Sequence, residues 1–207
     1  MITLQSKLPR SIYLACSGGV DSMAALDFLS RNHDVHVIHF NHKEGNSDET
    51  AEFILDYCTK RDIKVTIGQV TREKDKNESF EEYCRNERYK YFNNFSDKPI
   101  ITCHHLDDCV ETWIWSCLNG EGKIIPFRNN NVIRPFRLTS KSDFENWCRM
   151  KNVPWIQDFS NEDTGFMRNF IRHELMPKAL VVNPGLKKVV MKKVKEDDKI
   201  GADRFSD

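Results

Sequence analysis

The chain alternates between short apolar runs and longer stretches in which apolar residues recur every three or four positions. The short runs predict strands; they cover residues 11–16, 34–40, 63–67 and 99–103, with a brief fifth run at 132–133. The longer stretches predict helices; they follow Gly19 and cover residues 47–61, 78–95 and 106–118. Strands that alternate with helices of this length predict βαβ units. We therefore expect an α/β fold with a doubly wound, five-stranded parallel sheet and helices on both of its faces.

After Pro135 the pattern becomes helical. Helices are expected over residues 140–150 and 165–175, and Pro177 is expected to end the second one. Asn183-Pro184 resembles an N-cap followed by proline at the first helical position, which predicts a last helix with Leu186, Val190 and Val194 on one face. We divide the chain into an α/β part, 1–135, and a small helical extension, 136–207, whose last residues are expected to fray.

The composition agrees with a globular protein. The 207 residues are 39% hydrophobic, which is enough for a substantial core. No run approaches the roughly 18 consecutive apolar residues of a membrane helix, and the first residues lead into a strand rather than a signal peptide. We expect a soluble, cytoplasmic protein. Its seven cysteines include no C-x-x-C pair, which favours reduced structural thiols.

The strongest candidate for chemistry is a loop that directly follows the first strand and opens a helix. Its residues are Ser17, Gly18, Gly19, Val20, Asp21 and Ser22. Two glycines let the backbone approach a phosphate, and the helix N-terminus favours its negative charge. Asp21 is a candidate ligand for Mg²⁺ that bridges phosphates. A plain Gly-Gly turn would not explain the serines and the aspartate, and no Gly-Lys-Ser/Thr follows, so the loop is not a Walker A motif.

Two further strand ends carry polar residues. After the fourth strand, His104-His105 precede a helix with Asp107, Asp108 and Glu111. Carboxylates three and four residues apart repel one another on a helix, so a cationic partner such as Mg²⁺ or an amine is expected. A solvated acidic face is the alternative. His39 and Asn41 end the second strand, where such folds bind a nucleoside; a structural histidine is the alternative there.

Arginines form the remaining candidates. Arg85 and Arg88 lie on the third predicted helix, and Arg168, Asn169 and Arg172 on a later one. Guanidinium groups bind phosphate bidentately, so both sets could face ATP phosphates or an RNA backbone. Ordinary surface solvation is the alternative. The total charge is balanced, with 31 basic and 31 acidic residues, and does not itself indicate a nucleic-acid partner.

In this order the motifs resemble those of the N-type ATP pyrophosphatases, and among them the tRNA(Ile)-lysidine synthetase family. The loop from Ser17 to Ser22 is similar to the pyrophosphatase (PP) loop. The other matching segments are His104-His105-Leu106-Asp107-Asp108-Cys109-Val110-Glu111-Thr112, Cys84-Arg85-Asn86-Glu87-Arg88-Tyr89, Arg134-Pro135, Asp158-Phe159-Ser160-Asn161 and Arg168-Asn169-Phe170-Ile171-Arg172. The resemblance runs from about Ile12 into the 190s.

The resemblance implies an adenine nucleotide alpha hydrolase-like fold, in which residues 1–135 bind ATP and Mg²⁺ and the helical extension completes the active site. It also implies ligation of lysine to the wobble cytidine of an isoleucine tRNA with a CAU anticodon, through an adenylated cytidine, with release of AMP and pyrophosphate. The chain would be a compact form without the family's C-terminal domains.

The resemblance further assigns roles to particular residues. The catalytic set would be Asp21, Asp108, Glu111, Arg168 and Arg172. ATP would be bound by the PP loop with His39, Asn41 and His104. The lysine and tRNA would be bound by Asp107, Asp108, Glu111, Arg85, Arg88 and Asn169.

Other readings stay open from the sequence. One is a PP-loop enzyme that modifies another tRNA or a small molecule, although the lack of C-x-x-C argues against a thiolase. Another is a nucleotide-binding module without chemistry. Five lysines between Lys187 and Lys195 could meet RNA or form a solvated face. A homodimer is also compatible with the sequence.

Overall fold

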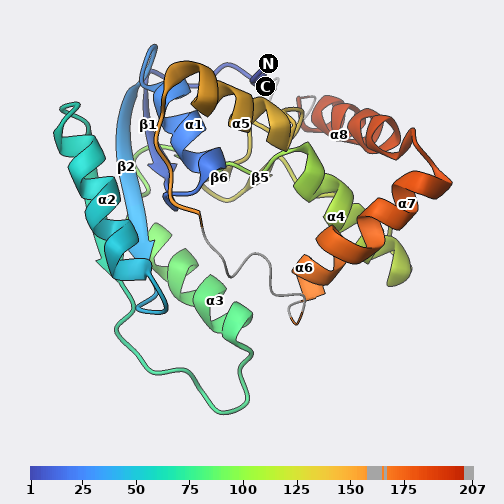
Figure 1. Ribbon diagram of the computed structural model, residues 1–207, viewed down its shortest axis with the longest axis horizontal. Coiled ribbons are helices and arrows are strands. Elements are labelled where there is room, and N and C mark those ends of the chain that lie inside the picture. The colour runs from blue at the N-terminus through green and yellow to red at the C-terminus, as the bar shows by residue number, and fades with distance from the viewer. Residues whose placement is uncertain (158–164, 166, 203–207) are drawn as a thin grey trace.

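The computed structural model describes residues 1–157, 165 and 167–202. The α/β part contains β1 (Ser11–Ala15), α1 (Val20–Leu29), β2 (Asp34–Asn41), α2 (Ser47–Thr59), β3 (Lys64–Gln69), α3 (Phe80–Phe92), β4 (Ile100–Ile101), α4 (Leu106–Leu118), β5 (Arg128–Asn129) and β6 (Val132–Ile133). Then follow α5 (Lys141–Lys151), α6 (Met167–Phe170), a π-helix (Ile171–Leu175), α7 (Met176–Val182) and α8 (Leu186–Ala202). Figure 1 shows the sheet flanked by helices and the C-terminal helices beside α4.

The sheet confirms the expected doubly wound α/β fold and adds one strand. Its order is β3-β2-β1-β4-β6-β5, and every pairing is parallel except the β5–β6 hairpin. The sheet is therefore six-stranded rather than five-stranded. Sequence reasoning missed β5 because Arg128 and Asn129 form a two-residue polar strand with no alternation, created by a turn in which Asn130 adopts a left-handed conformation (φ 53°).

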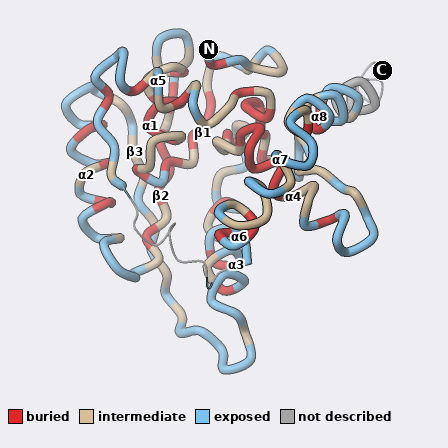
Figure 2. The backbone as a smooth tube through the Cα atoms, turned by 45° about the vertical axis from the view of Figure 1, so that its right-hand side comes forward, coloured by how far each residue is buried: buried red, intermediate tan, exposed pale blue. Residues whose placement is uncertain are grey.

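Alternating side chains of the strands supply a core on each face of the sheet. Ile12 and Leu14 of β1 pack into a cluster with residues of α1, α2 and α5. Tyr13, between them, faces the opposite side and packs with Phe92 of α3. This period of two fixes which face each helix covers. Figure 2 shows the buried residues gathered in the strands and α1.

The C-terminal helices pack on α4. Leu186, Val190 and Val194 share one buried face of α8, as predicted, and contact Leu106 and Val110 of α4. The prediction that Pro177 ends a helix was wrong. Helix α6 continues into the π-helix, whose wider turn places the Met176 N–H on the Ile171 carbonyl, and Pro177 then lies in the first turn of α7. A proline there lacks only an N–H that the first turn of a helix does not need.

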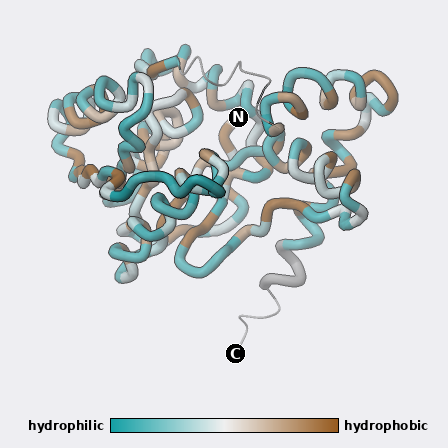
Figure 3. Tube along the Cα trace, turned by 90° about the horizontal axis from the view of Figure 1, so that it is seen from below, coloured by the Kyte–Doolittle hydropathy of each residue, from teal (hydrophilic) through white to brown (hydrophobic). Residues whose placement is uncertain are grey.

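A long loop joins β3 to α3 on the lower side of the molecule. It is largely exposed, and Figure 3 shows it as a continuous hydrophilic stretch. Arg72 holds the loop to α3 through Nε, which donates to Glu87 (2.7 Å), and bonds within the loop through Nη2, which donates to Glu78 (2.8 Å). Within the described residues, no helix is long and apolar enough to cross a membrane.

All seven cysteines are free thiols, as predicted, and they differ sharply in exposure. Cys117 is exposed, whereas burial raises the pKa of Cys58 and Cys109 to about 12. Since the thiolate is the nucleophile, we expect iodoacetamide to modify Cys117 first in the native protein. Peptide mass mapping would show this, with Cys117→Ser as the control that removes the fast phase. Early labelling of Cys58 or Cys109 would contradict the buried placement of α2 and α4.

Candidate functional site

The site lies where the strand order reverses. β1 is flanked by β2 on one side and β4 on the other, so the connections leave in opposite directions at this point. In open α/β sheets, ligands bind outside the carboxyl ends of the strands at such a switch point. The predicted loop follows β1, and His104-His105 follow β4. The topology therefore brings the two strongest sequence motifs together (Figure 1).

The PP loop is fixed by its own serines and by a close approach to α2. Ser22 Oγ accepts from the Ser17 N–H (3.2 Å) and donates to the Gly19 carbonyl (3.0 Å). Gly18 has φ +79°, and a Cβ there would lie 2.8 Å from Cγ2 of Thr50. Only glycine suits this position, because the backbone is left-handed and a Cβ would collide with the Thr50 side chain. Gly19 is the N-cap of α1, whose first N–H groups face the predicted phosphate position.

Asp21 in the first turn of α1 is half-buried, and one of its oxygens has no partner. Oδ2 lies 3.7 Å from His105 Nε2, whereas the buried Oδ1 has no hydrogen-bond partner among the described residues. Burial raises the pKa of Asp21, nearby His105 opposes that rise, and Asp108 adds to it. A carboxylate oxygen left without a donor in a buried position is suited to a cation.

The strand-end residues predicted to bind the nucleotide have different surroundings. His39 Nδ1 contacts the Cys16 carbonyl (2.8 Å), while its buried Nε2 has no partner among the described residues. Burial lowers the pKa of His39 and lowers that of His104 to about 3, so both are neutral near pH 7. Asn41 is instead engaged in the loop after β2, since it donates to Asp48 (2.6 Å) and accepts from the Lys43 N–H (2.7 Å).

Asp108 and Glu111 form a buried acidic pair on α4 that is neutralised by two arginines. Arg172 donates to Glu111 through Nε (2.6 Å) and Nη2 (3.1 Å). Arg168 donates to Asp108 through Nη2 (2.9 Å) and lies 3.3 Å from Glu111 through Nε. Asp108 and Glu111 thus have a cationic partner, as expected from the close spacing of carboxylates along α4. The partner comes from the chain's own C-terminal helices, and Asn169, between the arginines, is buried.

Asp107 lies apart from this pair. Its carboxylate accepts from the Lys141 N–H at the start of α5 (2.9 Å) and forms an ion pair with Lys187 of α8. In the structure Asp107 therefore joins α4 to two other helices, although the sequence placed it in the substrate site. Consecutive helix positions are about 100° apart, which separates Asp107 from Asp108.

Further positive charge lies close to Arg168. Desolvation of the Arg88 guanidinium lowers its pKa although the residue as a whole is exposed, and the nearby guanidinium groups of Arg85 and Arg168 lower it further. Burial, Arg88 and His39 lower the pKa of His42 to about 4. Arg85 also stacks over the Tyr89 ring at 4.9 Å. Cations held close together in this way favour an anionic ligand.

Sequence reasoning missed two contributors. His105 is buried between Asp21 and Asp108, and Lys141 lies close enough to Asp21 to influence its charge. Histidine is not a preferred N-cap residue, so the sequence carried no signal for its cap on α4, and its contact with α1 is tertiary. The predicted Asp158–Asn161 motif lies outside the described residues.

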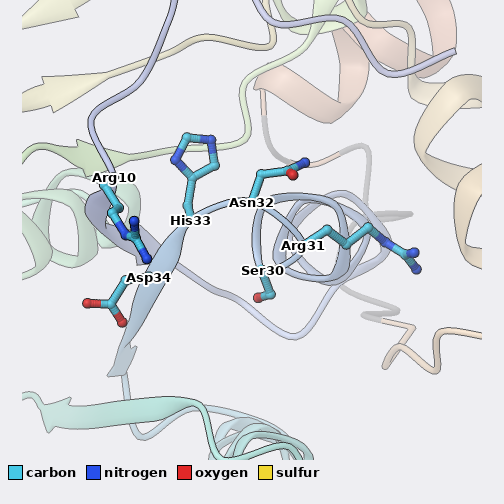
Figure 4. A pocket seen from close by; sticks show the side chains of 6 residues that line it. All are labelled: Arg10, Ser30, Arg31, Asn32, His33 and Asp34. Atoms are coloured by element: carbon cyan, nitrogen blue, oxygen red, sulfur yellow. The ribbon is translucent and has the colours of Figure 1, made fainter.

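A separate polar hollow lies at the opposite end of the sheet, where β2 begins (Figure 4). It is lined by Arg10, Ser30, Arg31, Asn32, His33 and Asp34. Several of these side chains already have partners: Asp34 accepts from Ser11 Oγ (3.1 Å), and the His33 ring contacts the Pro9 carbonyl (2.9 Å). This hollow is remote from the strand ends that carry the motifs.

The fold and the strand-end loop define a PP-loop protein. The chain belongs to the PP-loop domain family, whose model matches residues 2–179. It is 35% identical over 193 residues to the tRNA(Ile)-lysidine synthase of Persephonella marina, covering 84% of this chain and 42% of that protein. It is 30% identical over 200 residues to the tRNA(Ile)-lysidine synthase of a Thermotoga species, covering 88% and 48%. The chain thus spans less than half the length of these relatives.

Solved structures confirm the fold. The U34-tRNA thiolase NcsA from Methanococcus maripaludis, solved with its [4Fe-4S] cluster, superposes with a TM-score of 0.72 at 16% identity, covering 94% of this chain and 73% of that one. NH3-dependent NAD synthetase from Campylobacter jejuni superposes with a TM-score of 0.55 at 14% identity, covering 95% of this chain and 88% of that one.

Within the described part of this chain, no group of three or more cysteine, histidine or acidic side chains is placed to hold a metal ion.

Proposed function

We propose that this chain binds ATP at the PP loop and uses it to join lysine to the wobble cytidine of an isoleucine tRNA with a CAU anticodon. One observation carries the proposal: a phosphate-binding loop, a buried acidic pair and a group of arginines converge at one end of the sheet. The similarity to tRNA(Ile)-lysidine synthases supports the same acceptor and the same two-step ligation. A protein that modifies tRNA would act in the cytoplasm.

In the first step, the cytidine O2 attacks the α-phosphorus of ATP and the bond to pyrophosphate breaks. The N–H groups of the PP loop and the arginines stabilise the charge that grows on the leaving pyrophosphate. Asp21 fits a Mg²⁺ site, because its Oδ1 is buried and lacks a partner, and Mg²⁺ binds through one or two carboxylates plus substrate phosphates. Bound there, Mg²⁺ would neutralise phosphate charge.

In the second step, the lysine amine attacks C2 of the adenylated cytidine, and AMP leaves with the former O2. Asp108 and Glu111 would hold the lysine ammonium and assist loss of its proton. Arg168 and Arg172 occupy these oxygens in the structure. The lysine ammonium would therefore displace these guanidinium groups when it binds, before the first step, and leave them available to the ATP phosphates.

Pyrophosphate release from ATP tests the proposal. We expect release over many turnovers that requires both lysine and unmodified tRNA, because only lysine consumes the adenylated cytidine, and that falls by at least about 100-fold in Asp21→Ala because the cation loses its carboxylate. Asp27→Ala, on the same helix but engaged with Trp147 and Arg31, is the matched control. Release with neither lysine nor tRNA present would indicate a PP-loop enzyme with another acceptor. No release under any condition would indicate a nucleotide-binding module.

A further inference from the structure

His105 is buried at the junction between α4 and α1, and only 2% of its surface is exposed. It is the N-cap of α4, where its Nδ1 accepts from the Asp108 N–H (3.3 Å). Asp108 returns the contact, since its Oδ2 accepts from the His105 N–H (2.9 Å). This reciprocal capping box fixes the plane of the imidazole ring.

The capping contact also decides which ring nitrogen carries the hydrogen. A neutral imidazole nitrogen that accepts an N–H cannot carry a hydrogen itself, so the hydrogen of His105 is on Nε2. That nitrogen lies 3.7 Å from Oδ2 of Asp21. The ring therefore directs an N–H dipole at one oxygen of Asp21, while the other oxygen, Oδ1, is buried without a partner among the described residues.

We propose that His105 is a positioning residue for Asp21, which it holds through Oδ2 so that Oδ1 is presented to the cation on the ATP phosphates. The inference rests on the proposed role of Asp21 as the cation ligand. Removing a group that orients a metal-binding carboxylate changes metal affinity by about 10- to 100-fold. At 3.7 Å, the contact from His105 to Asp21 is electrostatic and longer than a hydrogen bond. Capping alone does not call for histidine, because asparagine, aspartate or serine caps a helix better.

Two substitutions separate the capping contact from the contact with Asp21. In His105→Asn, the amide oxygen replaces Nδ1 as the N-cap acceptor, but nothing reaches Asp21. In His105→Gln, the longer side chain places an amide N–H near the position of Nε2 and gives up the cap. A purely structural histidine would be replaced better by asparagine, and a positioning histidine better by glutamine.

The test measures binding of Mn²⁺, as a paramagnetic substitute for Mg²⁺, by electron paramagnetic resonance in the presence of α,β-methylene-ATP. We expect His105→Asn to weaken Mn²⁺ binding by about 10- to 100-fold with a Tm near that of the wild type. We expect His105→Gln to retain most of the affinity while its Tm falls by about 2–4 °C through loss of the cap. In Asp21→Asn, adding His105→Asn should change the affinity no further. The ¹⁵N NMR signature of His105 should report hydrogen on Nε2.

Wild-type affinity in His105→Asn, or losses in both variants that follow Tm alone, would overturn the inference. So would a wild-type protein that binds no Mn²⁺ with the analogue. The measurement needs no turnover, so it remains distinct from the test of the proposed function. A protein that binds Mn²⁺ in the expected pattern and never releases pyrophosphate would refute the proposed ligation and leave the role of His105 standing.

Discussion

Glu111→Gln is expected to lower the free energy of unfolding by about 2 kcal/mol and to lower lysine-dependent turnover by about 100-fold. The side chain keeps its shape but loses the charge that two guanidinium groups share. Glu111 is 2% exposed, whereas the Arg172 and Arg168 side chains are 18% and 49% exposed, so solvent reduces the loss below that of a fully buried pair. The turnover loss is larger because the same carboxylate is proposed to hold the amine.

Urea denaturation and steady-state kinetics would measure the two losses. Glu174→Gln is the control, because Glu174 lies on the π-helix that carries Arg172 and, among the described residues, forms an exposed pair with Lys178 (3.1 Å). We expect it to change stability by less than about 0.5 kcal/mol. If Glu111→Gln were as stable as this control, the arginines would not be held by the acidic pair in solution.

Arg137→Met is expected to lower the free energy of unfolding by about 3 kcal/mol, which corresponds to roughly 6–12 °C in Tm. Arg137 is fully buried after β6 and donates to the Ile125 carbonyl (2.7 Å) and to Asp197 of α8 (2.8 Å). Methionine fills much of the space but leaves the partly buried Ile125 carbonyl without this donor. It also releases one attachment of α8.

Differential scanning calorimetry would measure this effect. Arg149→Met on α5 is the control, because Arg149 is exposed and contacts Glu145 only at 3.5 Å. Asp197→Ala should cost at least as much as Arg137→Met, because it leaves the fully buried Arg137 guanidinium without this counter-ion, whereas in Arg137→Met the remaining Asp197 carboxylate is 42% exposed and can be solvated. Equal Tm values for Arg137→Met and Arg149→Met would mean that α8 docks through its apolar face alone.

Helices and strands in which apolar residues recur at a regular spacing could be predicted from the sequence. Elements that form only through tertiary contacts could not. The helix expected over residues 106–118 has those bounds in the structure, because its apolar face is continuous. The hairpin strand β5 and the π-helix carry no period of their own. The division of the chain at residue 135 stays a prediction.

The site was predictable to a similar degree. Strand ends place the PP loop, His39 and His104 at one edge of the sheet by topology alone. The sequence predicted that a positive charge would lie beside Asp108 and Glu111. It could not predict which residues supply that charge, because this depends on how α6 and the π-helix pack on α4. The side-chain directions of Asp107 and Asn41 depend on partners that lie far away in sequence or in the following loop.

A π turn contains one residue more than an α turn needs, and here it follows α6, which carries Arg168, contains Arg172 and leads directly into the docked helix α7. The number of residues in this segment therefore sets how the arginines are oriented relative to α7. Losing one residue within it would restore an ordinary helix and turn the arginines by about 100° relative to α7. Exchanges of side chains other than Arg172 in this segment are consequently tolerable where they preserve its length, while insertions and deletions would disconnect the guanidinium groups from the acidic pair.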